Sequence, residues 1–434
     1  MSSTEKKNYL LPIIMMIFLF AMISFVTNLA APMGVVLKNQ FGVSNAMGML
    51  GNLGNFIAYA FMGIPAGLLL QRIGYKKTAL IAVAVGFAGV GIQYLSGHTG
   101  QDSAFAVYLL GAFVAGFSMC MLNTVVNPML NTLGGGGKKG NQLIQIGGTF
   151  NSLSATLVPI LVGALVGEVA KANITDVFPV MYIAMGIFAL VFIVLSMVQI
   201  PEPHMVKQAV SAVSDKFSAL SFRHFKLGAV AIFVYVGIEV GIPSTLNLFL
   251  ADATAGGGLD GTTAGFVTGT YWFLMLIGRF TGASIGGKVS SKAMLTVASA
   301  IGLVLVLLAI MLPTTQNISM PVFMTDPATG ALSFGMTQVP INAMFLVLCG
   351  LCTSVMWGGI FNLAVEGLGK YTAKASGIFM VMVCGGGILP FLQNLIADNA
   401  SYMTSYWVVF AGLAYMLYYS AIGSKNVNTD IPVE

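Results

Sequence analysis

One carboxylate stands in a stretch of the chain that otherwise avoids charge. Glu239 lies within the apolar sequence AIFVYVGIEVGIPSTLNLFLAD, residues 231–252, and Pro243 follows it four positions later. A charged side chain at the middle of a bilayer costs about 2.5–3.5 kcal/mol, so an acid retained there indicates a functional site. Such a carboxylate can carry a proton, bind a cation or accept a hydrogen bond from a substrate hydroxyl.

Pro243 affects the backbone beside Glu239. Because proline has no N–H, it removes the hydrogen bond that a helical residue donates four positions back. A carbonyl freed at membrane depth is tolerated where it lines a cavity, so we expect a bent helix that presents Glu239 to a wet site. The alternative is a structural ion pair, and Arg279, the cation inside another apolar run, is the expected partner.

The composition requires a membrane environment. Of 434 residues, 57% are hydrophobic and only 8% are charged, whereas soluble domains carry about 25% charged residues. Apolar runs of about 20 residues are long enough to cross a bilayer as helices. We predict an all-α membrane protein with twelve such spans: 10–36, 45–70, 77–96, 104–132, 143–167, 177–199, 227–251, 263–286, 293–312, 340–365, 372–397 and 402–421.

A polar segment divides the predicted spans into six and six. It covers residues 201–226 and predicts a cytoplasmic central loop between an N-terminal half, 1–200, and a C-terminal half, 227–434. Nearly all Lys and Arg residues of the loops fall on one side of the predicted spans. An excess of these cations marks the cytoplasmic side, so we expect both termini in the cytoplasm of a multi-pass membrane protein.

The two halves repeat each other in outline. A short basic turn follows the second span, from Gly67, and a similar turn follows the eighth span, from Gly282. The fourth and tenth spans run into matching Asn, Leu and Gly positions that begin at Asn127 and Asn362. Internal repeats of this kind predict two pseudo-symmetric six-helix halves.

Twelve spans in two parallel halves resemble the major facilitator superfamily, whose members hold substrate near the midplane between rocking halves. The superfamily signature Gly-x-x-x-Asp-Arg-x-Gly-Arg-Lys matches this chain at Gly67, Arg72, Gly74 and Lys76, but Gln71 replaces the acid. The resemblance implies a gating role for Arg72. The alternative is a tight turn in a positively charged cytoplasmic loop.

Six stretches are similar to the fucose:proton symporter family, which carries fucose, galactose and glucose. They occur in the same order over nearly the whole chain: NPMLNTLG (127–134), TFNSL (149–153), YVGIEV (235–240), GTYWFLMLIGRFTG (269–282), IFNLAVEGLGKYT (360–372) and GGGILP (385–390). The resemblance implies uptake of a monosaccharide across the bacterial inner membrane, driven by an ion gradient.

This chain departs from that family at positions that matter for coupling. The resemblance places Ala31 and Asn123 where the family carries acids, and Gly148 where it carries a substrate-contacting Gln. Trp357 stands in place of a family aromatic residue. The coupling ion is therefore open: protons through Glu239, sodium, or no coupling at all.

A sugar site needs amides and carboxylates for the hydroxyls and an aromatic plane for the ring face. The predicted substrate-binding residues supply these groups from both halves: Asn28, Asn123, Asn127, Gln145, Asn151, Glu239, Asn247, Trp357 and Asn362. Asn28 matches an Asn in the family's first span, and Glu239 is the predicted coupling group. We expect no cofactor and no metal, since the cysteines and histidines form no ligand cluster.

We therefore predict a monomeric secondary transporter that imports a fucose-, galactose- or glucose-like sugar by alternating access. The alternatives are a carrier or exporter of another small polar solute and a membrane sugar sensor that does not transport. An enzyme is disfavoured, because the spans contain no paired acids and no nucleophile–base pair. A nucleic-acid partner is disfavoured because the cations are spread over loops rather than clustered.

Overall fold

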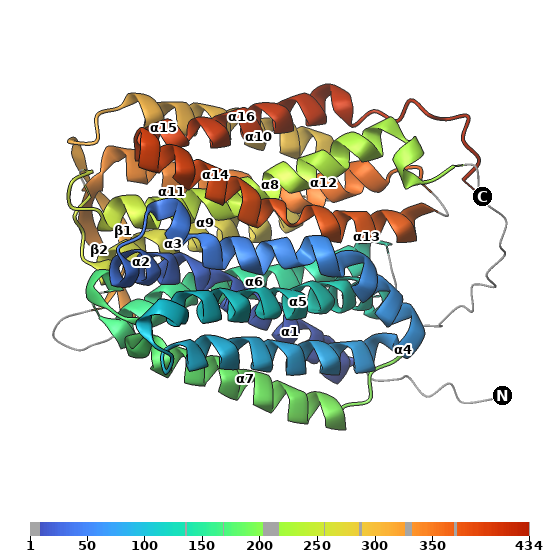
Figure 1. The fold of residues 1–434 in the computed structure, drawn as a ribbon. Coiled ribbons are helices and arrows are strands. Elements are labelled where there is room, and N and C mark those ends of the chain that lie inside the picture. The colour runs from blue at the N-terminus through green and yellow to red at the C-terminus, as the bar shows by residue number, and fades with distance from the viewer. Residues whose placement is uncertain are drawn as a thin grey trace.

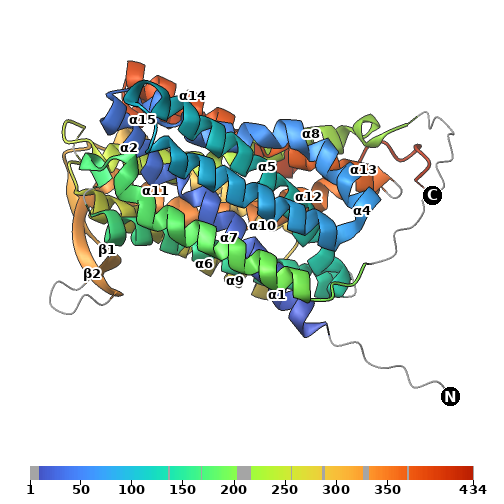
Figure 2. The same ribbon diagram turned by 60° about the horizontal axis from the view of Figure 1, so that its bottom comes forward.

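The computed structural model describes residues 9–134, 137–167, 169–202, 217–255, 257–285, 289–325, 332–368 and 371–433. Long helices lie side by side along one common direction, and a small hairpin crosses one end of the bundle (Figures 1 and 2). Eleven stretches of the described chain are long and apolar enough to cross a membrane. The predicted span 263–286 forms one more long helix among them, α9 (Gly261–Ile285).

The first half of the bundle is built from residues 10–197. Its elements are α1 (Leu10–Asn28), α2 (Ala30–Phe41), α3 (Asn45–Gly48), α4 (Leu50–Ser96), α5 (Gln101–Leu133), α6 (Gly137–Val166), the 3-10 helices η1 (Val169–Lys171) and η2 (Ile174–Val177), and α7 (Phe178–Met197). The first predicted span is thus α1 and α2 joined at Leu29.

The second half begins inside the predicted central loop, 201–226, of which residues 203–216 lie outside the described part of the structure. Its elements are η3 (Ala219–Ser221), α8 (Arg223–Ala251), α9, α10 (Ser291–Met311), β1 (Asn317–Thr325), β2 (Leu332–Pro340), α11 (Ile341–Thr353), α12 (Met356–Val365), α13 (Thr372–Met382), α14 (Gly385–Asn399), α15 (Tyr402–Ser405), α16 (Trp407–Tyr418) and the π-helix η5 (Tyr419–Gly423). The tenth to twelfth predicted spans are therefore broken helices.

The second and third predicted spans are two arms of α4, which bends at Gly74. Gly74 has φ +83°, a conformation that residues with a Cβ rarely adopt. The carboxylate of Glu202, beyond the end of α7, accepts hydrogen bonds from the amides of Tyr75 at 2.8 Å and Lys76 at 3.1 Å. An acid at the start of the second arm satisfies amides that the helix itself leaves free.

The two halves meet along two seams. α6 packs along α9, and α4 packs along α13 and α14. In the second seam the amide of Asn52 donates to the Gly386 carbonyl at 2.9 Å. A Cβ added at Gly387 would lie 2.8 Å from Cβ of Phe56, so glycine there permits the close approach of α14 to α4.

A two-stranded hairpin, not anticipated from the sequence, joins α10 to α11. β1 pairs antiparallel with β2, in a register that sets Asn317 opposite Pro340. Met320 and Val322 alternate along β1 and are buried, 5% and 0% exposed. The hairpin lies at the end of the bundle that also holds α2 and α15 (Figure 2).

Candidate functional site

Glu239 and Arg279 form an ion pair inside the bundle. Nη2 of Arg279, on α9, lies 3.0 Å from Oε1 of Glu239, on α8. The arginine side chain is 13% exposed and the glutamate side chain 15% exposed. The expected partner of the intramembrane acid is thus confirmed as Arg279, within hydrogen-bond distance.

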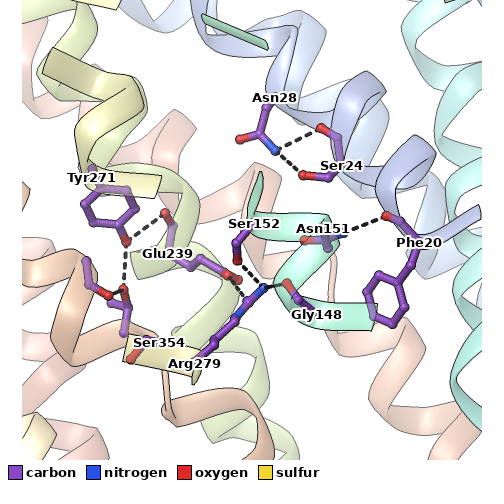
Figure 3. Close-up of polar contacts among 12 residues, drawn as sticks. Phe20, Ser24, Asn28, Gly148, Asn151, Ser152, Glu239, Tyr271, Arg279 and Ser354 are labelled. Atoms are coloured by element: carbon purple, nitrogen blue, oxygen red, sulfur yellow. Dashed lines mark hydrogen bonds and ion pairs between the residues drawn. The ribbon is translucent and has the colours of Figure 1, made fainter. Parts of the chain in front are cut away.

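The guanidinium of Arg279 also joins the two halves (Figure 3). Its Nη1 donates to the carbonyl of Gly148 at 3.0 Å and to Oγ of Ser152 at 2.7 Å. These two residues are four positions apart on α6 and share one face of it. We call Glu239, Arg279, Gly148, Ser152 and Tyr271 the central cluster.

Gly148 leaves space that the arginine uses. A Cβ added at Gly148 would lie 3.9 Å from both Cδ and Nη1 of Arg279. The resemblance places a substrate-contacting Gln at this position, and a side chain of that length would compete with the guanidinium for the same space. This chain instead presents a backbone carbonyl there, to which Arg279 donates.

The structure shows which group satisfies the carbonyl freed by Pro243, while the predicted bend and wet site stay predictions. Without an N–H, Pro243 cannot donate to the carbonyl of Glu239, which accepts instead from the hydroxyl of Tyr271 on α9 at 3.2 Å. The same hydroxyl lies 3.0 Å from Oγ1 of Thr353, at the end of α11. The carbonyl is therefore satisfied by a neighbouring helix.

Tyr235 extends the central cluster toward Trp357. It stands one turn before Glu239 on the same face of α8. Its hydroxyl is buried and faces the Glu239–Arg279 pair, with which it interacts. The rings of Tyr235 and Trp357 lie 6.2 Å apart at 54°, and Trp357 is half-buried. These rings form an aromatic surface next to the ion pair.

Two predicted binding residues, Asn28 on α1 and Asn151 on α6, form hydrogen bonds in the first half. Asn28 donates to Ser24, at 2.9 Å to its carbonyl and 3.0 Å to its Oγ (Figure 3). Asn151 donates to the Phe20 carbonyl at 2.9 Å and so ties α6 to α1. Gln145 lies on α6, but its side chain is outside the described part of the structure.

Asn123 and Asn127 occupy successive turns of α5. Asn123 donates to the hydroxyl of Tyr59, on α4, at 2.8 Å. Asn127 donates to the Asn123 carbonyl at 3.0 Å, while its own Oδ1 is buried and receives no hydrogen bond from a described residue. Each asparagine is half-buried, and their roles in substrate binding stay predictions.

The remaining predicted residues lie apart from the central cluster. Asn247 is buried two turns beyond Glu239 and donates to Oγ1 of Thr268 at 3.2 Å. Asn362, on α12, is exposed. Arg72 is exposed near the bend of α4, where its side chain makes no ion pair or hydrogen bond to a described residue. Their binding and gating roles stay predictions.

A second polar network joins the halves at the end of the bundle opposite the start of α1. We call it the outer network: Lys38, Asn45, Asp252, Asp398 and Tyr402. The carboxylate of Asp398 accepts from the amides of Asn45 and Ala46, both at 2.8 Å. The Tyr402 hydroxyl donates to Asn45 Oδ1 at 3.2 Å or to Asp252 Oδ2 at 3.1 Å.

Asp252 carries the ion pair of this outer network. Its Oδ2 lies 3.7 Å from Nζ of Lys38. Partial burial acts to raise the pKa of Asp252, but hydrogen bonds from Thr254, the charge of Lys38 and the Tyr402 hydroxyl together hold it below its ordinary value. Because this pKa is depressed, the ionised Asp252 stabilises the outer network at neutral pH, and the stabilisation is lost only as the pH falls through the lowered value.

The model of the Major Facilitator Superfamily matches residues 13–391. The chain belongs to the major facilitator superfamily. The glucose/galactose transporter of Brucella abortus biovar 1 (strain 9-941) is 30% identical over 435 residues, which cover 98% of this chain and 97% of the relative. The L-fucose-proton symporter of Escherichia coli (strain K12) is 23% identical over 428 residues, 91% of this chain and 89% of that one. The predicted family is confirmed.

Solved structures confirm the twelve-helix fold. The crystal structure of the E. coli fucose:proton symporter superposes with a TM-score of 0.68 at 19% identity, covering 97% of this chain and 100% of the other. A D-xylose-proton symporter gives a TM-score of 0.73 at 14% identity, covering 97% and 99%. The chain is a multi-pass membrane transporter, as predicted, and not an enzyme.

Sequence reasoning missed three members of the site. Ser152, Tyr271 and Tyr235 lie inside the motifs that resemble the sugar transporters, but no pattern in the sequence assigned any of them a contact with Glu239 or Arg279. One signal existed for Tyr271: a carbonyl freed by Pro243 needs a hydroxyl or amide donor from another helix. A second existed for Tyr235, which stands four residues before Glu239 and therefore shares its face.

Proposed function

We propose that this superfamily member imports a monosaccharide of the glucose, galactose or fucose kind across the bacterial inner membrane by alternating access. The names of its relatives, a glucose/galactose transporter and an L-fucose-proton symporter, support this class of substrate. The observation that carries the proposal is the central cluster, where Arg279 bonds both to an intramembrane acid and to the opposite half.

Arg279 links substrate binding to the movement of the halves. If α6 moves away from α9, the bonds from Nη1 to Gly148 and Ser152 break. A buried guanidinium that loses its acceptors costs free energy. Sugar hydroxyls are acceptors as well as donors, so a bound sugar can replace the lost bonds. The substrate thereby lowers the cost of separating the halves at this point.

Glu239 provides the route for coupling to protons. Its carboxylate holds Nη2 of Arg279 at 3.0 Å. Protonation removes the charge that attracts the guanidinium and leaves a hydroxyl able to donate to a sugar oxygen. We infer that proton binding at Glu239 and release of Arg279 are one event in the transport cycle.

The ring face of the sugar would pack on Trp357 and Tyr235. These rings lie 6.2 Å apart next to the central cluster, and aromatic planes bury the apolar face of a solute while its rim stays polar. From the first half, Asn127 offers a buried carboxamide oxygen without a described partner. A sugar held between these groups would touch both halves, as alternating access requires.

Uptake by purified protein in liposomes tests the function. Labelled glucose, galactose and fucose are offered separately with an inward proton gradient, and empty liposomes and a labelled polyol are the controls. We expect at least one sugar to accumulate above its outside concentration, and the unlabelled form of that sugar to compete. Saturable binding of the sugars without internal label would contradict transport and favour a sensor. Accumulation of none of them would contradict the substrate class.

A further inference from the structure

A small cavity of about 10 Å³ lies within the first half and shares no lining residue with the central cluster. It is bounded by the junction of α1 and α2, by both arms of α4 and by the start of α5. Asn55, Gln93 and Tyr108 line it together with apolar residues. A volume near 10–15 Å³ holds about one water-sized particle, so the cavity suits a single ion or solvent molecule.

The carboxamides that line the cavity carry unsatisfied oxygens. Asn55 and Gln93 are each 5% exposed. No described residue donates to Oδ1 of Asn55 or to Oε1 of Gln93. A buried acceptor without a partner costs about 1–3 kcal/mol, and two such acceptors on one cavity indicate a site for a positively charged or donating ligand.

Val26, one of the residues that line the cavity, has a backbone carbonyl freed by the break between α1 and α2. The Leu29 amide bonds to Phe25 at 3.3 Å, and the next bond across the junction runs from Met33 to Leu29 at 3.1 Å. The Val26 carbonyl, whose residue lines the cavity, therefore receives no amide from Ala30. The carboxyl end of a helix carries negative partial charge, and unwound carbonyls at such breaks coordinate cations in transporters.

We propose that this cavity is a binding site for one monovalent alkali cation, ligated by Asn55 Oδ1, Gln93 Oε1 and the Val26 carbonyl. All three groups are neutral oxygen acceptors, the type of ligand that hard cations prefer. No carboxylate lines the cavity, which favours a single charge over a divalent ion. The site shares no residue with the central cluster, so its ligands can be substituted without touching Glu239.

Thermal unfolding in detergent without any sugar tests the site. The wild-type protein is melted in equal concentrations of sodium, potassium or choline chloride; choline is too large for the cavity. We expect sodium or potassium to raise the melting temperature by about 2–5 °C over choline. Asn55→Ala and Gln93→Leu should each abolish this shift.

A matched variant controls for the loss of any buried carboxamide. Asn342, on α11, is fully buried and also has an Oδ1 without a described donor, but it lies outside the cavity. Asn342→Ala should melt at a lower temperature yet keep the full cation shift. If Asn55→Ala does not fold, Asn55→Asp provides a second test of the site. Its added negative charge should lower the half-saturating cation concentration at least about tenfold.

Two results would overturn the cation site. One is a wild-type melting temperature that is equal in sodium, potassium and choline chloride. That result would mean that the cavity holds a water molecule rather than a cation. The other is a cation shift that survives in Asn55→Ala or in Gln93→Leu. Because no sugar is present, either outcome is separate from a failure of sugar transport.

Discussion

Arg279 is the residue on which the central cluster depends. One guanidinium holds the carboxylate of Glu239 at 3.0 Å and donates to both Gly148 and Ser152 on the opposite half. Charged hydrogen bonds are stronger than neutral ones, and removal of one partner from a buried pair leaves the other charge uncompensated. Removal of either partner alone should therefore destabilise the protein.

Substitution of Arg279 tests this expectation. Arg279→Ala should lower the free energy of unfolding by about 3–5 kcal/mol, because it strands Glu239 without a partner. Addition of Glu239→Gln should recover part of this loss by removing the stranded charge. Melting temperatures of the two single variants and the double variant give the coupling. Strictly additive losses would show that the pair is not coupled.

Tyr271 offers a test of the backbone argument. Tyr271→Phe removes the hydroxyl that donates to the Glu239 carbonyl at 3.2 Å, and should cost about 1–3 kcal/mol. Pro243→Ala supplies an amide that can bond the same carbonyl within α8. The cost of Tyr271→Phe should therefore shrink in the Pro243→Ala background. An equal cost in both backgrounds would mean that the carbonyl is not what Tyr271 stabilises.

Part of the central cluster is predictable from the sequence. Glu239 and Arg279 are charged residues inside apolar runs, and Pro243 identifies the carbonyl that it leaves without a hydrogen bond. These three residues can therefore be recognised from their residue types and positions alone. Ser152 and Tyr271 do not, because hydroxyl residues are common in membrane helices. Whether these hydroxyls face Glu239 depends on how α6 and α9 are rotated about their axes in the packed bundle. No local sequence pattern reports that rotation.

At the scale of elements, the bend of α4 depends on the positive φ of Gly74 and on the carboxylate of Glu202, a residue distant in sequence. Glu202 bonds the amides of Tyr75 and Lys76 from beyond α7. A Cβ at Gly74 would lie 2.5 Å from Oε2 of this carboxylate. The acid that the superfamily signature expects at Gln71 is absent, and Glu202 supplies a carboxylate to this turn from another part of the chain.

Substitution of Gly74 should therefore be costly. Gly74→Ala forces an unfavourable positive φ of +83° and displaces the Glu202 carboxylate, so we expect a loss of about 1–3 kcal/mol. The matched control is Gly67→Ala on the same helix, where an added Cβ would meet nothing within 4 Å; it should be neutral or stabilising. Equal melting temperatures for the two variants would contradict the role of Gly74.

The long helices follow from the apolar runs, but two kinds of element do not. The β1–β2 hairpin lies in a segment with no span-length apolar run, and its pairing depends on packing such as that of Phe334 against Phe273, with ring centroids 5.6 Å apart. The breaks at Leu29 and between α11 and α12 interrupt runs that read as continuous. Hydropathy reports the length of a span and not the continuity of its hydrogen bonds.

At the scale of the whole molecule, the outer network holds the halves together at the end opposite the start of α1. Asp398 caps α3 from the other half, and Lys38 pairs with Asp252 across the same boundary. If the termini are cytoplasmic, as the cation distribution predicts, this end faces outward. The outer network is then a gate that separates when the site opens to the outside.

Spin labels across this gate test its role. Met47 on α3 and Ala400 before α15 are exposed on opposite halves, and cysteines there can be labelled while the four native cysteines are buried. Asp398→Ala should lengthen the distance between the labels. The control Asp102→Asn changes an exposed acid at the start of α5 and should leave the distance as in wild type. No change in Asp398→Ala would mean that the outer network does not hold the gate.

The most direct measurement compares two modes of transport in Glu239→Gln liposomes. Gln keeps the hydrogen-bonding shape of Glu239 but can neither bind nor release the coupled proton. We predict that sugar exchange between the two sides continues while accumulation driven by a proton gradient is abolished. If Glu239→Gln accumulates sugar as well as wild type does, Glu239 is not the coupling group and the account of the central cluster is wrong.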